Sequence, residues 1–162
     1  MSVPQKVDHA AIKVSQGMVI GLNIAAFIFN LPVLAVVVTI FMLGGSLIGQ
    51  PGFKFVYRWL LKPLGLMKPE VIEDHPEPHR FAQLVGGLAM QAGVLLLFLG
   101  FSGWGWAFVW LVVALAALNL FGGFCVGCAM YYWLNRLQVP GFTQSPLSNM
   151  ARPGARPKAK QL

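Results

Sequence analysis

Cys125 and Cys128 carry the clearest chemical signal in the sequence. They are the only cysteines among 162 residues, and they lie three positions apart. On a helix this spacing places both side chains on one face, where a dithiol and a disulfide can interconvert. The preceding Gly122 and Gly123 favour a break in the helix, and a new helix starting there would stabilise the Cys125 thiolate with its free amide groups. We therefore expect Cys125 to attack a disulfide and Cys128 to resolve the product.

Two other interpretations of this pair stay open. One is that two small apolar side chains pack inside a helix bundle. The other is a tetrahedral zinc site made by Cys125, Cys128, His75 and His79. Pro76 and Pro78 lie between the two histidines and disfavour a regular helical spacing of these ligands. We therefore expect no bound metal and no cofactor.

Three polar residues are candidates for supporting roles around the cysteines. His79 and Arg80 carry, or can carry, a positive charge, and such groups stabilise a nearby thiolate. Asn119 precedes the cysteines in the same apolar run, where an amide commonly bonds to a neighbouring helix. We assign supporting roles to His79, Arg80 and Asn119.

The elements that must position these residues are membrane helices. Hydrophobic residues make up 57% of the chain and charged residues only 10%, against roughly 25% charged residues in soluble domains. No charged residue or histidine occurs in residues 14–53 or in residues 81–135. A helix that crosses a bilayer needs about 20 such residues. The two runs predict a membrane protein in contact with the lipid bilayer, and they argue against nucleic acid as a partner.

Two breaks divide these runs into four expected spans. Asn30-Leu31-Pro32 predicts a tight turn, because Pro lacks an amide donor and restricts the residue before it. Residues 102–106 contain two glycines and two tryptophans, which suit a break at the membrane interface. The expected fold class is an all-α membrane protein whose four transmembrane helices form two hairpins. The spans cover residues 12–29, 33–49, 81–101 and 107–134.

The segments outside the spans are basic. Residues 53–61 predict an amphipathic helix at the membrane surface between the two hairpins. Lys54, Arg58 and Lys62 share one face of it and are candidates for contact with lipid or another anion. Residues 1–136 then form the transmembrane domain. Residues 137–162 are rich in Pro, Gly, Lys and Arg, and predict a disordered basic tail.

The basic residues also predict the orientation. All twelve Lys and Arg lie in the N-terminal segment, the connection over residues 50–80 and the C-terminal segment, which four spans place on one side. The positive-inside rule puts these segments, both termini and the cysteine pair in the cytoplasm. We identify no cleaved signal peptide.

Five groups of residues form a recognisable set. They are Val7-Asp8-His9 through Gln16-Gly17; Asn30-Leu31-Pro32; Arg58 with Leu61-Lys62-Pro63-Leu64-Gly65 and Lys68-Pro69; Pro78-His79-Arg80-Phe81-Ala82-Gln83; and Ala117-Leu118-Asn119 to Cys125-Val126-Gly127-Cys128. Over residues 7–136 the set resembles the bacterial membrane family catalogued as domain of unknown function 4395. The resemblance implies a bacterial inner-membrane location and an association with thioredoxin-like and sulfurtransferase proteins. The family pattern includes the cysteine pair and His79-Arg80 but not His75, which weakens the zinc interpretation.

Three functions are compatible with the sequence. The first is thiol redox or sulfur transfer through Cys125 and Cys128, with a cytoplasmic thioredoxin-like or rhodanese-like partner. The second is a facilitator or transporter subunit for a small sulfur compound, with the cysteines lining its exit. The third is a structural or assembly subunit, for which closely packed small residues suffice. The sequence has no nucleotide-binding loop, haem ligand pair or hydrolytic triad, so it does not indicate a self-contained enzyme.

Overall fold

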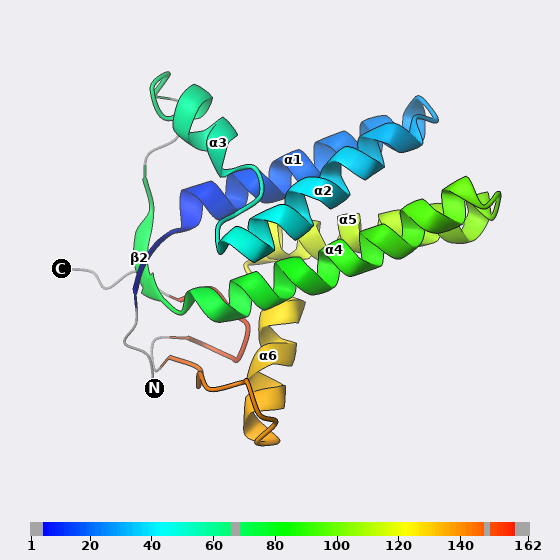
Figure 1. Cartoon of the computed structure of the whole chain (residues 1–162). Helices are drawn as coiled ribbons and strands as arrows, with labels where there is room; N and C mark the ends of the chain where they lie inside the picture. Colours follow the sequence, from blue (N-terminus) through cyan, green and yellow to red (C-terminus); the bar gives the residue numbers. More distant parts are fainter. Residues whose placement is uncertain (1–4, 66–68, 148–149, 158–162) are drawn as a thin grey trace.

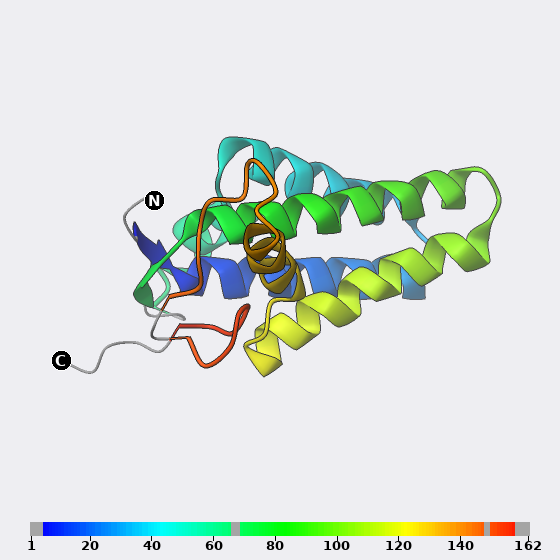
Figure 2. The same cartoon turned by 90° about the horizontal axis from the view of Figure 1, so that it is seen from below.

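The long helices lie roughly side by side and are joined at one end by two tight turns (Figure 1). The computed structural model describes residues 5–65, 69–147 and 150–157. Its main helices are α1 (His9–Ile28), α2 (Pro32–Ile48), α4 (Pro76–Phe98), α5 (Ser102–Gly122) and α6 (Val126–Arg136). Helix α4 packs against both α2 and α5, and α5 packs against α1 (Figure 2). The prediction of a mainly helical protein is confirmed.

Three of these helices, α1, α4 and α5, are long and apolar enough to cross a membrane. Helix α2, which corresponds to the expected span over residues 33–49, is apolar but has only 17 residues. Many large apolar side chains point outward, among them Leu47 at 79% and Phe121 at 83% exposure. Such a surface suits lipid and not water. The helices of this fold are therefore consistent with a membrane protein, and four spans stay a prediction.

The break in the second apolar run lies earlier than the sequence analysis placed it. Gly100 adopts a left-handed φ of +88° between α4 and α5, and residues 102–106 form the first turns of α5 instead of a loop. The glycine at 105 serves a close helix crossing, because a Cβ there would lie 2.9 Å from the carbonyl oxygen of Gly93 on α4. The predicted break at residues 102–106 was therefore wrong, because Gly105 lies within α5 and allows close packing against α4.

The predicted span over residues 107–134 is not one helix. Helix α5 ends at Gly122, and Gly123 follows with a left-handed φ of +63°. The chain then turns, and α6 runs across α4 in a different direction from α5 (Figure 1). The cysteines therefore lie outside the apolar helix α5, at the start of α6.

A short sheet departs from the all-α expectation. Strand β1 (Gln5–Asp8) pairs antiparallel with β2 (Val71–Asp74), with Gln5 opposite Asp74. Strand β1 leads directly into α1, and β2 leads into α4 after one residue. The Asp8 carboxylate caps α1 by accepting from Ala10 N–H at 3.0 Å, and it also accepts from Glu70 N–H at 3.2 Å. The sheet thus holds the first turns of α1 and α4 next to each other.

The segment expected to form a surface helix between the apolar runs is helical over residues 54–61, but its second part is π-helical. It consists of α3 (Lys54–Val56) and the π-helical turn η1 (Tyr57–Leu61). Tyr57 is buried against the first turns of α1, whereas Trp59 is exposed. Tyr57 therefore anchors the segment to the helix bundle, and the face of the segment that carries Trp59 points outward.

Candidate functional site

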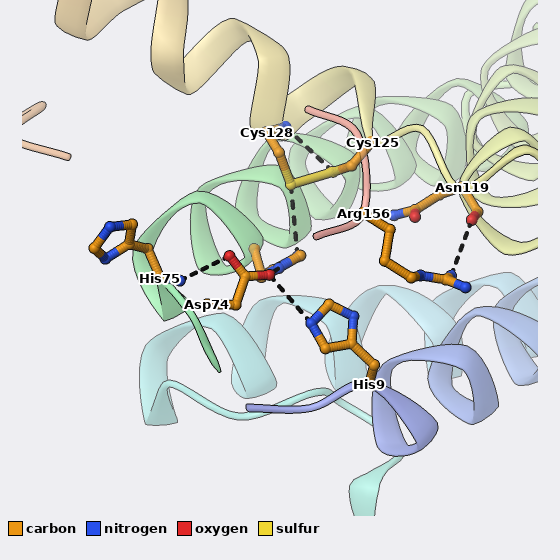
Figure 3. Close-up of a disulfide and its surroundings, with 8 residues drawn as sticks. His9, Asp74, His75, Asn119, Cys125, Cys128 and Arg156 are labelled. Atoms are coloured by element: carbon orange, nitrogen blue, oxygen red, sulfur yellow. Dashed lines mark hydrogen bonds and ion pairs between the residues drawn. A yellow bond between two sulfur atoms is a disulfide. The ribbon is translucent and has the colours of Figure 1, made fainter. Parts of the chain in front are cut away.

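Cys125 and Cys128 form a disulfide at the N-terminus of α6 (Figure 3). Their Cα atoms are 5.2 Å apart. Cys125 is the N-cap residue, with an extended backbone, and its Sγ accepts a hydrogen bond from the backbone N–H of Cys128 at 3.2 Å. Free amide groups at a helix N-terminus stabilise a thiolate. The geometry therefore favours Cys125 as the attacking thiol when the pair is reduced.

A histidine and a carboxylate extend the site from Cys128. His79 Nδ1 lies 3.5 Å from Cys128 Sγ, and His79 Nε2 lies 2.8 Å from Asp74 Oδ2. His79 is in the first turn of α4, and Asp74 ends β2. Because an ionised carboxylate can only accept, the His79 ring donates from Nε2 to Asp74. In the neutral ring, Nδ1 is then an acceptor that faces the sulfur of Cys128.

Asp74 is the buried centre of the polar cluster, with 1% of its surface exposed. His79 and His9 approach the same carboxylate oxygen, His9 Nε2 at 3.1 Å, and the backbone N–H of His75 donates to the other at 2.7 Å. Burial by itself raises the pKa of this carboxyl group. The hydrogen bond from His79, the close approach of His9, the charge of His79 and the His75 N–H outweigh it, so the pKa of Asp74 lies below its ordinary value.

This lowered pKa predicts an acid-dependent stability difference for the variant Asp74→Asn. A depressed carboxyl pKa adds stability above the unfolded-state pKa of about 3.9, and this stability is lost as the pH falls toward the lower folded-state pKa. We expect Asp74→Asn to be less stable by about 2 kcal/mol at neutral pH. Thermal unfolding in detergent from pH 7 to pH 3 should show the two proteins converging at the acid end. A difference independent of pH would contradict the assignment.

His75 does not join the cysteines, which corrects the zinc ligand set. Its side chain points away from the disulfide in Figure 3, and only its backbone N–H serves the cluster. Within the described residues, two groups of three could hold a metal ion: His79 with Cys125 and Cys128, and His79 with His9 and Asp74. The first group would need the cysteines reduced. The prolines did not prevent a helix, since Pro76 occupies its first turn and His75 precedes it as N-cap.

Of the other predicted site residues, Asn119 and Arg80 line cavities near the cysteines. Asn119 lines a small cavity of about 20 Å³ beside the disulfide, and its carbonyl oxygen accepts from Arg156 Nη2 at 3.4 Å (Figure 3). Arg80 turns away from the sulfurs and donates from Nε to the carbonyl oxygen of Ser46 at 3.3 Å. It lines a second, larger cavity that also reaches Cys125. The anion candidates line neither cavity; they are Lys54 on α3, Arg58 on η1 and Lys62 directly after η1.

Residues 150–157, which we call the strap, pass beside the start of α6 (Figure 2) and line the small cavity next to the disulfide. Cys125 N–H donates to the carbonyl oxygen of Gly154 at 2.8 Å, and Arg156 N–H donates to that of Gly123 at 2.8 Å. The cysteines are only 7% and 3% exposed. This part of the expected disordered tail takes a defined path, because the non-helical backbone between α5 and α6 needs hydrogen-bond partners. Residues 148–149 and 158–162 lie outside the described residues.

The variant Gly154→Val should detach the strap. Gly154 has a φ of +86°, and a Cβ there would lie 2.7 Å from both the carbonyl oxygen of Cys125 and the Cβ of Ala129. We expect reduction of the disulfide by a water-soluble phosphine to become about tenfold faster, because local opening controls access to buried groups. Gly141→Val is the matched control, since Gly141 has a similar φ of +98° but nothing within 4 Å of its Cβ position. Equal rates in both variants would show that the strap does not limit access.

His9 and Asp74 belong to the polar cluster but were not among the site residues predicted from the sequence. Two features of the sequence could have pointed to these residues. His9 lies in the Val7-Asp8-His9 motif, and four spans would already place the N-terminal segment and residues 50–80 on one side of the membrane. The missing information was the β1–β2 pairing, which brings the two segments into contact.

The fold and the site define a mainly helical protein with three helices suited to a membrane and a disulfide at a helix N-terminus, beside a histidine that contacts a buried aspartate. Residues 7–136 match the family described as Domain of unknown function (DUF4395), and the chain belongs to this family. The resemblance drawn from its motifs is thus confirmed. Comparisons with curated proteins and with solved structures find no match.

Proposed function

We propose that the protein is a bacterial inner-membrane thiol–disulfide exchange protein that acts through Cys125 and Cys128. Its partner would be a cytoplasmic thioredoxin-like or rhodanese-like protein. The observation that carries this proposal is the contact of Cys128 Sγ with His79 Nδ1, beside a Cys125 that caps α6. A pair of packing cysteines needs neither a helix N-cap nor a histidine ordered by a buried carboxylate.

Each of these contacts supports one step of exchange. The Cys125 thiolate attacks a partner disulfide, so that one S–S bond breaks, a mixed disulfide forms and the partner leaves one thiolate. Cys128 then attacks Cys125 Sγ and releases the second partner thiolate. His79 Nδ1 can take the Cys128 proton during this step, while Asp74 stabilises the charged ring through Nε2. The result is the disulfide of the structure and a reduced partner.

Redox titration of the purified full-length protein tests the proposal. The pair should exchange reversibly with glutathione buffers and with an oxidised thioredoxin, as measured by mass-tagged alkylation after acid quenching. In cells, acid-quenched samples should contain both redox forms of the pair. A disulfide that stays unchanged in every buffer, with the strap intact or detached by Gly154→Val, would contradict the proposal and favour a structural role for the cysteines.

A further inference from the structure

A cavity of about 300 Å³ lies between α1, α2, α4 and α5 and extends to the start of α6. Most of its lining is apolar, including Val19, Met42, Val85, Leu111 and Leu115. Cys125 and His79 also line it. Ligand pockets for small molecules start at about this volume. Cys125 therefore contacts the strap through its backbone and also lines an apolar cavity among the membrane-suited helices.

The few polar groups of this cavity suit a ligand with oxygen atoms on an apolar ring. The amide oxygen Oε1 of Gln16 is buried and has no hydrogen-bond partner among the described residues. It can accept a hydrogen bond from a ligand hydroxyl group. Arg80 lines the same cavity, and its guanidinium group has donors besides the Nε that bonds to Ser46. A ligand carbonyl oxygen could accept from these. An inorganic sulfur anion fits the mainly apolar lining less well.

We propose that this cavity binds the ring of a membrane-dissolved quinone, which oxidises the reduced Cys125–Cys128 pair. The inference rests on the proposed exchange function, run in the direction in which a partner dithiol reduces the Cys125–Cys128 disulfide. The quinone is then the electron acceptor that reoxidises the pair. Such a carrier would enter from the lipid and reach the pair without displacing the strap. A protein partner and the quinone would then reach the same disulfide by different routes.

The proposed step balances as a two-electron transfer. The S–H bonds of Cys125 and Cys128 break, and one S–S bond forms. Two electrons and two protons pass to the quinone, whose two carbonyl groups become the two hydroxyl groups of a quinol. When Cys125 starts as the thiolate, its proton has already left and the quinol takes the second proton from solvent. His79 Nδ1 lies where it can relay the proton of Cys128.

Anaerobic mixing of the reduced full-length protein with a short-chain ubiquinone tests the proposal. All ring positions of this quinone are substituted, so thiols cannot add to the ring. We expect one quinol to form for each cysteine pair oxidised, followed by quinone absorbance and by mass-tagged alkylation. The Cys125→Ser/Cys128→Ser double variant should reduce no quinone.

Two matched variants on α5 locate the reaction. Ala116 lines the cavity, whereas Ala114 on the same helix is exposed and is not among the lining residues. Ala116→Phe should slow quinone reduction by about tenfold or more by displacing the ring, while Ala114→Phe should change it by less than about twofold. Both variants should exchange normally with glutathione.

The outcomes separate the two proposals. Normal exchange with glutathione but no quinol formation, or equal rates for Ala116→Phe and Ala114→Phe, would overturn the quinone site and leave the exchange function standing. A pair that reacts with neither glutathione nor the quinone would overturn the exchange function itself.

Discussion

Cys128→Ser should accumulate a stable mixed disulfide on Cys125, whereas Cys125→Ser should trap no partner. Cys125 Sγ accepts the Cys128 backbone N–H at the N-terminus of α6 and so gains the helix amides that stabilise a thiolate. Without Cys128 the resolving step is lost, and the partner stays attached. Without Cys125, the remaining Cys128 thiol is 3% exposed and lacks the N-cap position. Exchange with glutathione should fall by about a thousandfold or more in Cys125→Ser.

Non-reducing gels followed by mass spectrometry of the species bound to Cys125 would measure this asymmetry. The matched control is the double Ser variant, which should give no adduct in the same membranes. Equal trapping by both single variants would mean that the helix N-terminus does not select the attacking thiol. An adduct of sulfane sulfur in place of a protein would direct the proposal toward sulfur transfer with a rhodanese-like partner.

Gly127→Ala should separate the cysteines from His79 and destabilise the protein. Gly127 lies where α6 crosses α4, and a Cβ there would lie 2.5 Å from the Cβ and 2.6 Å from the Cα of Ala82. Neither of these atoms belongs to a flexible side chain, so α6 must shift away from α4. Overpacking of this kind costs on the order of 1–3 kcal/mol. The shift should also lengthen the contact from Cys128 to His79, which is 3.5 Å in the structure.

The measurement is thermal unfolding in detergent together with the exchange rate of the cysteine pair. Gly21→Ala is the matched control, because Gly21 is also helical but has nothing within 4 Å of its Cβ position. That substitution should leave stability equal or slightly higher, since Ala is the better helix former. Equal effects of the two substitutions would show that the close crossing of α6 and α4 does not position the site.

The glycines also show where sequence patterns reach their limit. Regular spacing predicts that Gly17, Gly21 and their counterparts on other spans all serve helix packing. In the structure Gly17 and Gly21 are open, while Gly93, Gly105 and Gly127 lie at close crossings. Spacing identifies which glycines share a helix face, but only the position of the neighbouring helix decides whether that face is in contact.

The sequence by itself determined that the protein is mainly helical and suited to a membrane, and it determined the family. It also identified Cys125 and Cys128 as the candidate reactive residues. Long uncharged runs need no tertiary contact to be recognised, because the cost of placing charge in lipid acts on each residue separately. The helix break near Cys125 was also predicted from Gly122 and Gly123, although the expected final span ran through it to residue 134. These conclusions depend on local composition and spacing.

Only the tertiary structure decided which groups surround the disulfide. The strands β1 and β2 are four residues each, too short for a clear pattern, yet their pairing brings His9 to Asp74 and His79. The strap reaches Cys125 because the unpaired backbone after α5 needs partners, and Pro-rich and Gly-rich composition does not reveal this need. Contacts between residues far apart in the chain depend on where helices and strands meet. That is why His79 was predicted from the sequence, whereas its carboxylate partner Asp74 was not.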